Sequence, residues 1–126
     1  MIILDSDVLI EIYDKESVLG DRLVTELENS REEYLTTPIN IHEVFYSLLK
    51  YAGKSEYVEQ FPTLPFTGDD ALLSAKLAYS CEKVGNPVEK EDCMIAAIAI
   101  NNNAKIFTLN RKHFDRFKEF GLKLFD

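Results

Sequence analysis

Four oxygen-bearing side chains stand where short apolar runs of this sequence end, or where helical patterns begin. They are Asp5, Glu43, Asp92 and Asn110. The first directly follows the apolar run at 2–4, and the last follows the run at 105–109. If these runs are strands of one parallel sheet, all four side chains lie at its carboxyl edge, where open α/β proteins bind their ligands.

Converging carboxylates repel one another strongly unless a cation lies between them. Oxygen ligands without a nearby histidine or cysteine favour Mg²⁺ or Mn²⁺ over zinc. Such an ion suits phosphodiester hydrolysis, because one metal activates water and a second, roughly 4 Å away, stabilises the leaving oxygen. We therefore expect the carboxylates at this edge to hold such an ion. Water would then attack phosphorus in line.

Each acidic residue also has a purely structural interpretation. Asp7 and Asp92 stand at helix starts, where an aspartate commonly caps the helix. Glu43 alone resembles an ordinary solvated helix residue. Asp5 is harder to explain in this way, because an unpaired charge beside a buried strand is costly. The prediction of a site therefore depends on the whole set of residues at one edge.

The elements that must position these residues alternate along the chain. Strands are predicted over 2–4, 34–37, 63–66, 105–109 and 122–125. Helices are predicted over 8–13, 17–28, 39–51, 55–61, 69–84, 92–101 and 111–120. This alternation predicts a three-layer α/β/α fold, with a short parallel sheet flanked by helices. The length of 126 residues suits a single domain over 1–126.

Composition excludes several classes of protein. With 46% hydrophobic and 29% charged residues, the chain resembles ordinary globular proteins and not disordered ones. No apolar run approaches the roughly 20 residues of a membrane span, and the N-terminus lacks the pattern of a signal peptide. Cys81 and Cys93 fit neither a disulfide framework nor a zinc site, so we expect a cytoplasmic protein. The five glycines are isolated, so no phosphate-binding loop or nucleotide cofactor is expected.

Four segments of the chain resemble the motifs of PIN-domain ribonucleases. Residues 4–10, Leu-Asp-Ser-Asp-Val-Leu-Ile, resemble the opening motif of that family, and 41–44, Ile-His-Glu-Val, resemble the second. Residues 92–99 resemble the third, Asp-x-x-Ile-Ala-Ala-x-Ala, and 108–114 resemble the fourth, Thr-x-(Asp/Asn)-x-x-x-Phe. The match runs over the whole chain. As a short, single-domain protein, the chain is most similar to the toxin subunits of VapBC-type toxin–antitoxin modules.

The resemblance implies an endoribonuclease that depends on Mg²⁺ or Mn²⁺ and cuts single-stranded or looped RNA. It also implies a homodimer, inhibited by a small antitoxin whose C-terminal arm enters the groove. Position by position, Asp5, Glu43 and Asp92 would be the acidic metal-site residues. Asp7 would orient the site through hydrogen bonds, and Thr108 would help to shape its fourth corner.

The fourth motif departs from the commonest family pattern at one position. Asn110 stands where an acid is commonest, so an oxygen ligand is kept but a charge is lost. Substrate phosphate could then complete a second metal site, or Glu89 or Asp115 could compensate.

The chain carries a net charge of −8, yet 105–123 holds six bases against two acids. Within that strip, Arg111 and Lys112 could hold RNA phosphates.

Aromatic and imidazole side chains add weaker expectations. Tyr13, Tyr46 and Tyr51 could stack on bases. For Tyr46 and Tyr51, packing in the core or at a subunit interface is the preferred interpretation. His42 and His113 have no partner at a motif spacing, so no catalytic role is expected for either.

Two alternative functions remain open at this point. A haloacid-dehalogenase-type phosphatase also begins with a strand and Asp-x-Asp, as in 5–7, and 67–70 resemble its late Gly-Asp-Asp motif. Alternatively, the PIN-like fold is retained without catalysis, as an RNA- or protein-binding module. Asn110 is the residue that keeps the second alternative open.

Overall fold

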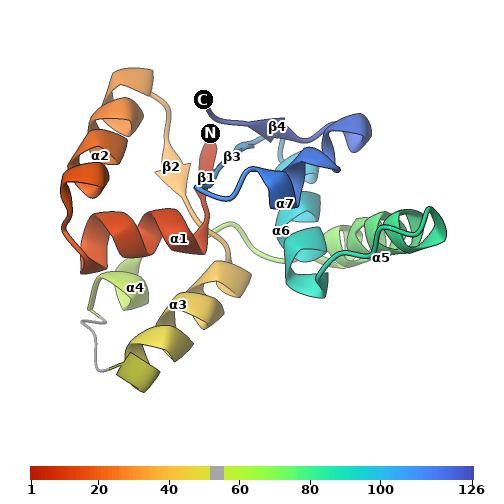
Figure 1. Cartoon of the computed structure of the whole chain (residues 1–126), viewed down its shortest axis with the longest axis horizontal. Helices are drawn as coiled ribbons and strands as arrows, with labels where there is room; N and C mark the ends of the chain where they lie inside the picture. The colour runs from red at the N-terminus through yellow and green to blue at the C-terminus, as the bar shows by residue number, and fades with distance from the viewer. Residues whose placement is uncertain (52–55) are drawn as a thin grey trace.

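The centre of the molecule is a four-stranded parallel sheet in the order β2-β1-β3-β4 (Figure 1). The computed structural model describes residues 1–51 and 56–126. The strands are β1 (Ile2–Leu4), β2 (Tyr34–Leu35), β3 (Lys105–Phe107) and β4 (Lys123–Leu124). In the register of the sheet, Ile3 of β1 lies opposite Leu35 and Ile106. The predicted α/β fold with a parallel sheet is thereby confirmed.

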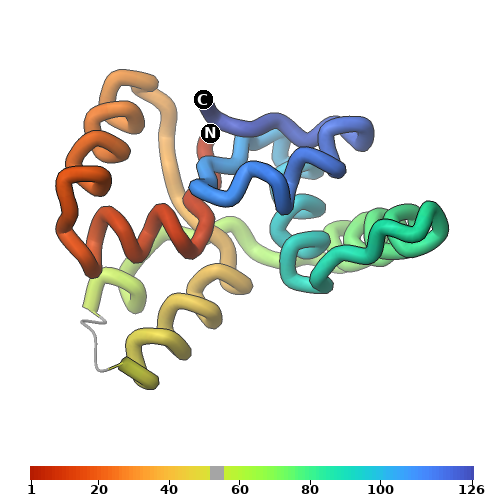
Figure 2. Tube along the Cα trace, in the orientation of Figure 1, coloured from red at the N-terminus to blue at the C-terminus, as the bar shows by residue number. Residues whose placement is uncertain are grey.

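Helices connect the strands and cover both faces of the sheet. They are α1 (Ser6–Leu9), the π-helix η1 (Ile10–Asp14), α2 (Val18–Ser30), α3 (Pro38–Tyr51), α4 (Glu56–Gln60), α5 (Gly68–Lys83), α6 (Lys90–Asn101), α7 (Lys112–Asp115) and the 3₁₀-helix η2 (Lys118–Phe120). Figures 1 and 2 show α1 to α4 on one side of the sheet and α5 to α7 on the other.

The alternation of side chains along β1 divides the core in two. Ile3 packs in a cluster with α5, α6 and α7, whereas Ile2 and Leu4 pack in a second cluster with α1 to α4. All three β1 side chains are 0% exposed, as expected for a central strand covered on both faces. The two clusters fix β1, and therefore also fix the residues that follow it.

The predicted strand over 63–66 is wrong. Only Thr63 pairs, through one isolated parallel bridge to Thr36. Pro62 and Pro65 flank this bridge, and proline cannot donate a backbone hydrogen bond to a ladder. The segment therefore follows β2 for one residue only.

Several predicted boundaries also change. The helix predicted over 111–120 is divided into α7 and η2, and the one predicted over 8–13 begins earlier and widens into η1. The strand predicted over 105–109 ends at Phe107. The helix predicted over 55–61 corresponds to α4, and Ser55 lies outside the described residues.

Of the two placements predicted for Tyr46 and Tyr51, the core is wrong, and the subunit interface stays a prediction. Tyr46 and Tyr51 of α3 are 62% and 74% exposed. Tyr13 packs internally, with its ring stacked on that of Tyr57 at a centroid distance of 5.2 Å. The apolar pattern of α3 therefore extends beyond the face that the core can cover.

Two further features concern the cysteines and the helices. Cys81 and Cys93 are buried free thiols. Across 1–51 and 56–126, the helices are too short or too polar to cross a lipid bilayer.

Candidate active site

Asp5 is held rigidly at the carboxyl end of β1. Its Oδ1 accepts hydrogen bonds from the Ser6 backbone N–H (2.9 Å) and Asn40 Nδ2 (3.0 Å). Its Oδ2 accepts from the Thr108 hydroxyl at 2.7 Å. Each carboxylate oxygen therefore has a donor that fixes its position, and the donors come from three different segments of the chain.

Glu43 reaches the same edge because only Thr36 and Thr37 separate the end of β2 from the start of α3. Pro38 is the first residue of that helix, a position that suits its fixed φ angle. Residues three apart in a helix lie on one face, so Asn40 and Glu43 point in the same direction. The Ser6 hydroxyl donates to Glu43 Oε1 at 3.0 Å, which links α1 to α3.

Asp7 joins α1 to the loop that follows β3. The backbone N–H of Leu109 lies 3.2 Å from both carboxylate oxygens of Asp7. Burial raises the pKa of Asp7 to about 6, and the nearby negative charge of Asp5 acts in the same direction. The hydrogen bonds from Leu109 and Thr108 oppose this rise.

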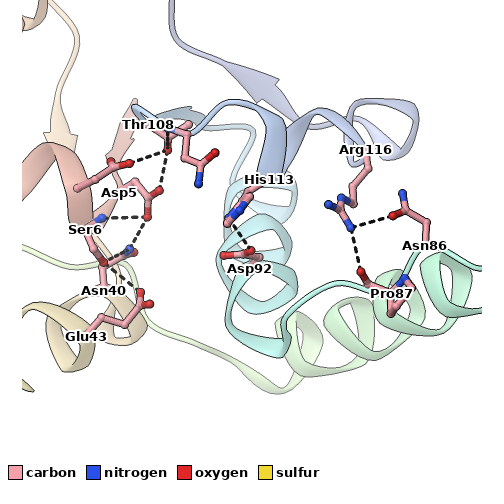
Figure 3. Close-up of polar contacts among 12 residues, drawn as sticks. Asp5, Ser6, Asn40, Glu43, Asn86, Pro87, Asp92, Thr108, His113 and Arg116 are labelled. Atoms are coloured by element: carbon pink, nitrogen blue, oxygen red, sulfur yellow. Dashed lines mark hydrogen bonds and ion pairs between the residues drawn. The ribbon is translucent and has the colours of Figure 1, made fainter.

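Asp92 belongs to a second group of side chains. It lies in the first turn of α6, and its Oδ2 is 3.4 Å from Nδ1 of His113 on α7. Burial raises the pKa of Asp92 to about 6, while His113 acts in the opposite direction. Figure 3 shows this pair apart from the network around Asp5, with the marked contacts running within each group.

A cavity of about 200 Å³ brings the two groups together. The side chains that line it are Asp5, Ser6, Asp7, Glu43, Glu89, Asp92, Asn110 and His113. Burial raises the pKa of Glu43, and the negative charges of Asp5 and Asp92 contribute to this rise. The four residues singled out in the sequence thus share one acidic cavity. Glu89 joins them, whereas Asp115 forms an ion pair with Lys118 at 3.0 Å.

The residues present fit a hard divalent cation by their chemistry. The cavity offers five carboxylates and the amide oxygen of Asn110, which is a donor set for Mg²⁺ or Mn²⁺. In the described ranges, no three acidic, histidine or cysteine side chains are close enough to form a preassembled metal site. Sharing one cation would require the Asp5 group and Asp92 to approach each other, and the cation would relieve their repulsion.

The two basic residues that follow Asn110 lie outside the lining of the cavity. The Arg111 guanidinium donates to the backbone oxygen of Phe125 (3.1 Å) and to Asp126 Oδ1 (2.9 Å). The Lys112 side chain is exposed. Neither Arg111 nor Lys112 is among the described residues that line the cavity, so a role in RNA binding stays a prediction.

For three residues of the cavity or its hydrogen-bond network, no role in the site was predicted from the sequence: Ser6, Asn40 and His113. A signal was present for Asn40, because it stands three residues before Glu43 and so shares its helix face. For Ser6 the signal was its place between two aspartates. His113 stands three residues after Asn110, but its contact with Asp92 depends on how α7 packs on α6.

The motif at 67–70 that suggested a phosphatase has a structural role. Thr67 and Asp70 form a reciprocal capping box at the start of α5, with bonds of 2.9 and 3.2 Å. The other oxygen of Asp70 accepts from Asn101 Nδ2 at 2.8 Å. These residues line a different cavity from that of Asp5, so the two halves of the phosphatase motif do not form one site.

Comparison with known proteins gives consistent results. The PIN domain family matches residues 2–119. Ribonuclease VapC1 from Methanocaldococcus jannaschii is 29% identical over 133 aligned residues, covering 99% of this chain and 87% of that protein. Ribonuclease VapC from Rickettsia bellii is 40% identical over 65 residues, covering 51% of this chain and 48% of that protein.

Solved structures resemble the fold over almost the whole chain. VapBC2 from Rickettsia felis, bound to a DNA fragment from its promoter, superposes with a TM-score of 0.75 at 20% identity, covering 99% of this chain and 98% of that one. FitAcB from Neisseria gonorrhoeae superposes with a TM-score of 0.74 at 20% identity, covering 100% of this chain and 97% of that one.

Proposed function

This chain belongs to the PIN domain family, and from that premise we propose that it is an endoribonuclease that hydrolyses RNA phosphodiester bonds with Mg²⁺ or Mn²⁺. We further propose that it is the toxin of a toxin–antitoxin pair. The ribonucleases VapC1 and VapC among its relatives support both statements. The likeness to VapBC structures supports the fold that the proposal requires.

The acidic cavity is the observation that carries the proposal. Asp5, Glu43 and Asp92 come from three distant parts of the chain and face one space. Burial and mutual repulsion raise the pKa values of Glu43 and Asp92, and each has a contribution from the charge of Asp5. Such an arrangement is costly for folding alone, which favours a functional role.

In the proposed reaction, Asp5, Glu43 and Asp92 would hold the cation. When bound, Mg²⁺ or Mn²⁺ activates water and offsets the negative charge of the phosphate. Thr108 and Asn40 keep the two oxygens of Asp5 in place through their hydrogen bonds. The amide of Asn110 lines the same cavity and would position water or the ion there.

Cleavage of a labelled, structured RNA by the purified protein tests this function. Mg²⁺, Mn²⁺ and EDTA are compared for the native chain, for Asp5→Asn and for Asp115→Asn. Asp115 is a matched control, because it is half-exposed and pairs with Lys118 outside the cavity. We expect cleavage that EDTA and Asp5→Asn abolish and that Asp115→Asn retains.

Other outcomes lead to different conclusions. Full cleavage by Asp5→Asn would contradict the proposed mechanism. RNA binding without cleavage would instead favour the inactive binding module, for which Asn110 in place of an acid is the supporting feature. Turnover of a phosphomonoester without RNA cleavage would contradict RNA as the substrate.

We also propose two protein partners, a second copy of the chain and a small antitoxin. Large apolar side chains stand exposed on α3 and α5, which favours a partner surface there. They are Tyr46, Leu49, Tyr51, Leu72 and Tyr79. Light scattering of the purified chain tests the homodimer, and Leu49→Asp is expected to shift it toward the monomer. Unchanged mass for that variant would exclude α3 from the dimer surface.

We propose the cytoplasm as the compartment. The two free thiols, Cys81 and Cys93, support a reducing environment. Fractionation of cells that express the chain tests this assignment, and its recovery outside the cytoplasmic fraction would contradict it.

A further inference from the structure

Asn40 is a buried amide placed between the acidic side chains of the cavity. It is 0% exposed. Its Nδ2 donates to Asp5 Oδ1 and to Ser6 Oγ, both at 3.0 Å. Its Oδ1 accepts from the Thr37 hydroxyl at 2.6 Å. Both hydrogens of the amide are therefore directed at residues of the candidate active site.

Thr37 determines which way this amide faces. The Thr37 hydroxyl has one hydrogen, and it donates that hydrogen to Asn40 Oδ1 while accepting from the Asn40 backbone N–H at 3.2 Å. The oxygen of the amide is thus directed at Thr37, and the nitrogen at Asp5. A carboxylate can only accept, so the opposite orientation would place two acceptors against each other.

Ser6 connects Asn40 to Glu43 through two hydrogen bonds. The serine hydroxyl accepts one hydrogen bond from Asn40, so its single hydrogen is available for Glu43 Oε1, 3.0 Å away. Figure 3 shows this connected path from Asp5 through Asn40 and Ser6 to Glu43. One amide therefore contacts Asp5 directly and reaches Glu43 through a single hydroxyl.

From these contacts we infer that Asn40 is a positioning residue, which sets the places of Asp5 and Glu43 together and thereby the affinity of the cavity for a divalent cation. The inference rests on the proposed function. Asp5 and Glu43 carry like charges, so without the amide and the hydroxyl between them they would move apart toward solvent. Removing a group that orients metal ligands typically weakens metal binding roughly 10–100-fold.

Direct Mn²⁺ binding without RNA tests the inference. Electron paramagnetic resonance of unbound Mn²⁺ is measured for the native chain, for Asn40→Ala, for Ser6→Ala and for the double variant. Asn101→Ala is the matched control, because Asn101 also donates an amide hydrogen to a carboxylate, that of the buried Asp70. Thermal unfolding in EDTA reports the structural cost of each change separately.

We expect Asn40→Ala to weaken Mn²⁺ binding by roughly 10-fold or more, and Ser6→Ala to weaken it by less. Since both act on Glu43 through the same hydroxyl, the loss in the double variant is expected to be smaller than the product of the single losses. Asn101→Ala is expected to lower the melting temperature and to leave Mn²⁺ binding unchanged.

The results separate this inference from the proposed function. A native chain that binds Mn²⁺ and cleaves RNA, together with an Asn40→Ala variant of unchanged Mn²⁺ affinity, would overturn the inference alone. A native chain that neither binds Mn²⁺ nor cleaves RNA would overturn both. If Asn40→Ala does not fold, the Mn²⁺ affinity of Ser6→Ala tests the inference instead. Several-fold weaker Mn²⁺ binding would support the path from Asn40 through Ser6 to Glu43, and unchanged Mn²⁺ binding would overturn it.

Discussion

Replacing Thr108 by valine tests how firmly Asp5 is held. Valine keeps the volume of threonine but removes the hydroxyl that donates to Asp5 Oδ2 at 2.7 Å and accepts from the Asn110 backbone N–H at 3.0 Å. Thr108 is 4% exposed, so water replaces this hydroxyl poorly. A hydrogen bond to a charged group contributes about 1.5–3 kcal/mol, and we expect the free energy of unfolding to fall by that amount.

Urea unfolding in EDTA measures this change without any contribution from metal. Thr108→Ser is the control, because serine keeps the hydroxyl and loses only a methyl group, which costs about 1 kcal/mol. We also expect RNA cleavage to fall roughly 10-fold or more in the valine variant, since one oxygen of Asp5 is no longer directed. Equal unfolding free energies for the native and valine proteins would show that the Thr108 hydroxyl does not stabilise the position of Asp5.

Two further predictions concern parts of the fold away from the cavity. A Cβ at Gly20 would lie 2.5 Å from the Glu11 backbone oxygen, so Gly20→Ala should lower the unfolding free energy by about 1–3 kcal/mol; an unchanged urea midpoint would contradict the close packing of α2 on η1. Hydrogen bonds from Lys105 and the terminal amino group lower the pKa of Glu32 to about 2. Glu32 therefore contributes stability that is complete above its ordinary pKa of 4.5 and is lost as pH falls toward about 2. Glu32→Gln should lower the melting temperature more at about pH 6 than at about pH 3, and an equal effect at both would contradict this assignment.

The placement of the main acidic residues could be predicted from the sequence because it depends on topology. Asp5 follows a buried strand, and Asn110 comes just after the strand that pairs beside it. The carboxyl ends of parallel strands meet at one edge, so short motifs were sufficient to locate the cavity. Glu43 and Asp92 followed from the starts of the two helices that approach that edge.

What could not be predicted depends on side-chain packing in three dimensions. The contact of His113 with Asp92 requires α7 to lie on α6, and no spacing in the sequence encodes that approach. Arg111 has a sequence position suited to RNA phosphates, but its guanidinium is held at Phe125 and Asp126. The apolar spacing of α3 did not show that Tyr46 lies outside the core.

We propose that Asp92, on α6, and the group around Asp5 act on one divalent cation. The most direct measurement is the RNA cleavage rate of Asp92→Asn against that of the native chain, over a range of Mn²⁺ concentrations. We predict a loss of at least roughly 100-fold that added Mn²⁺ does not restore, because a correctly held metal ion stabilises the transition state by several kcal/mol. Native cleavage rates for Asp92→Asn, with the same Mn²⁺ dependence, would contradict it.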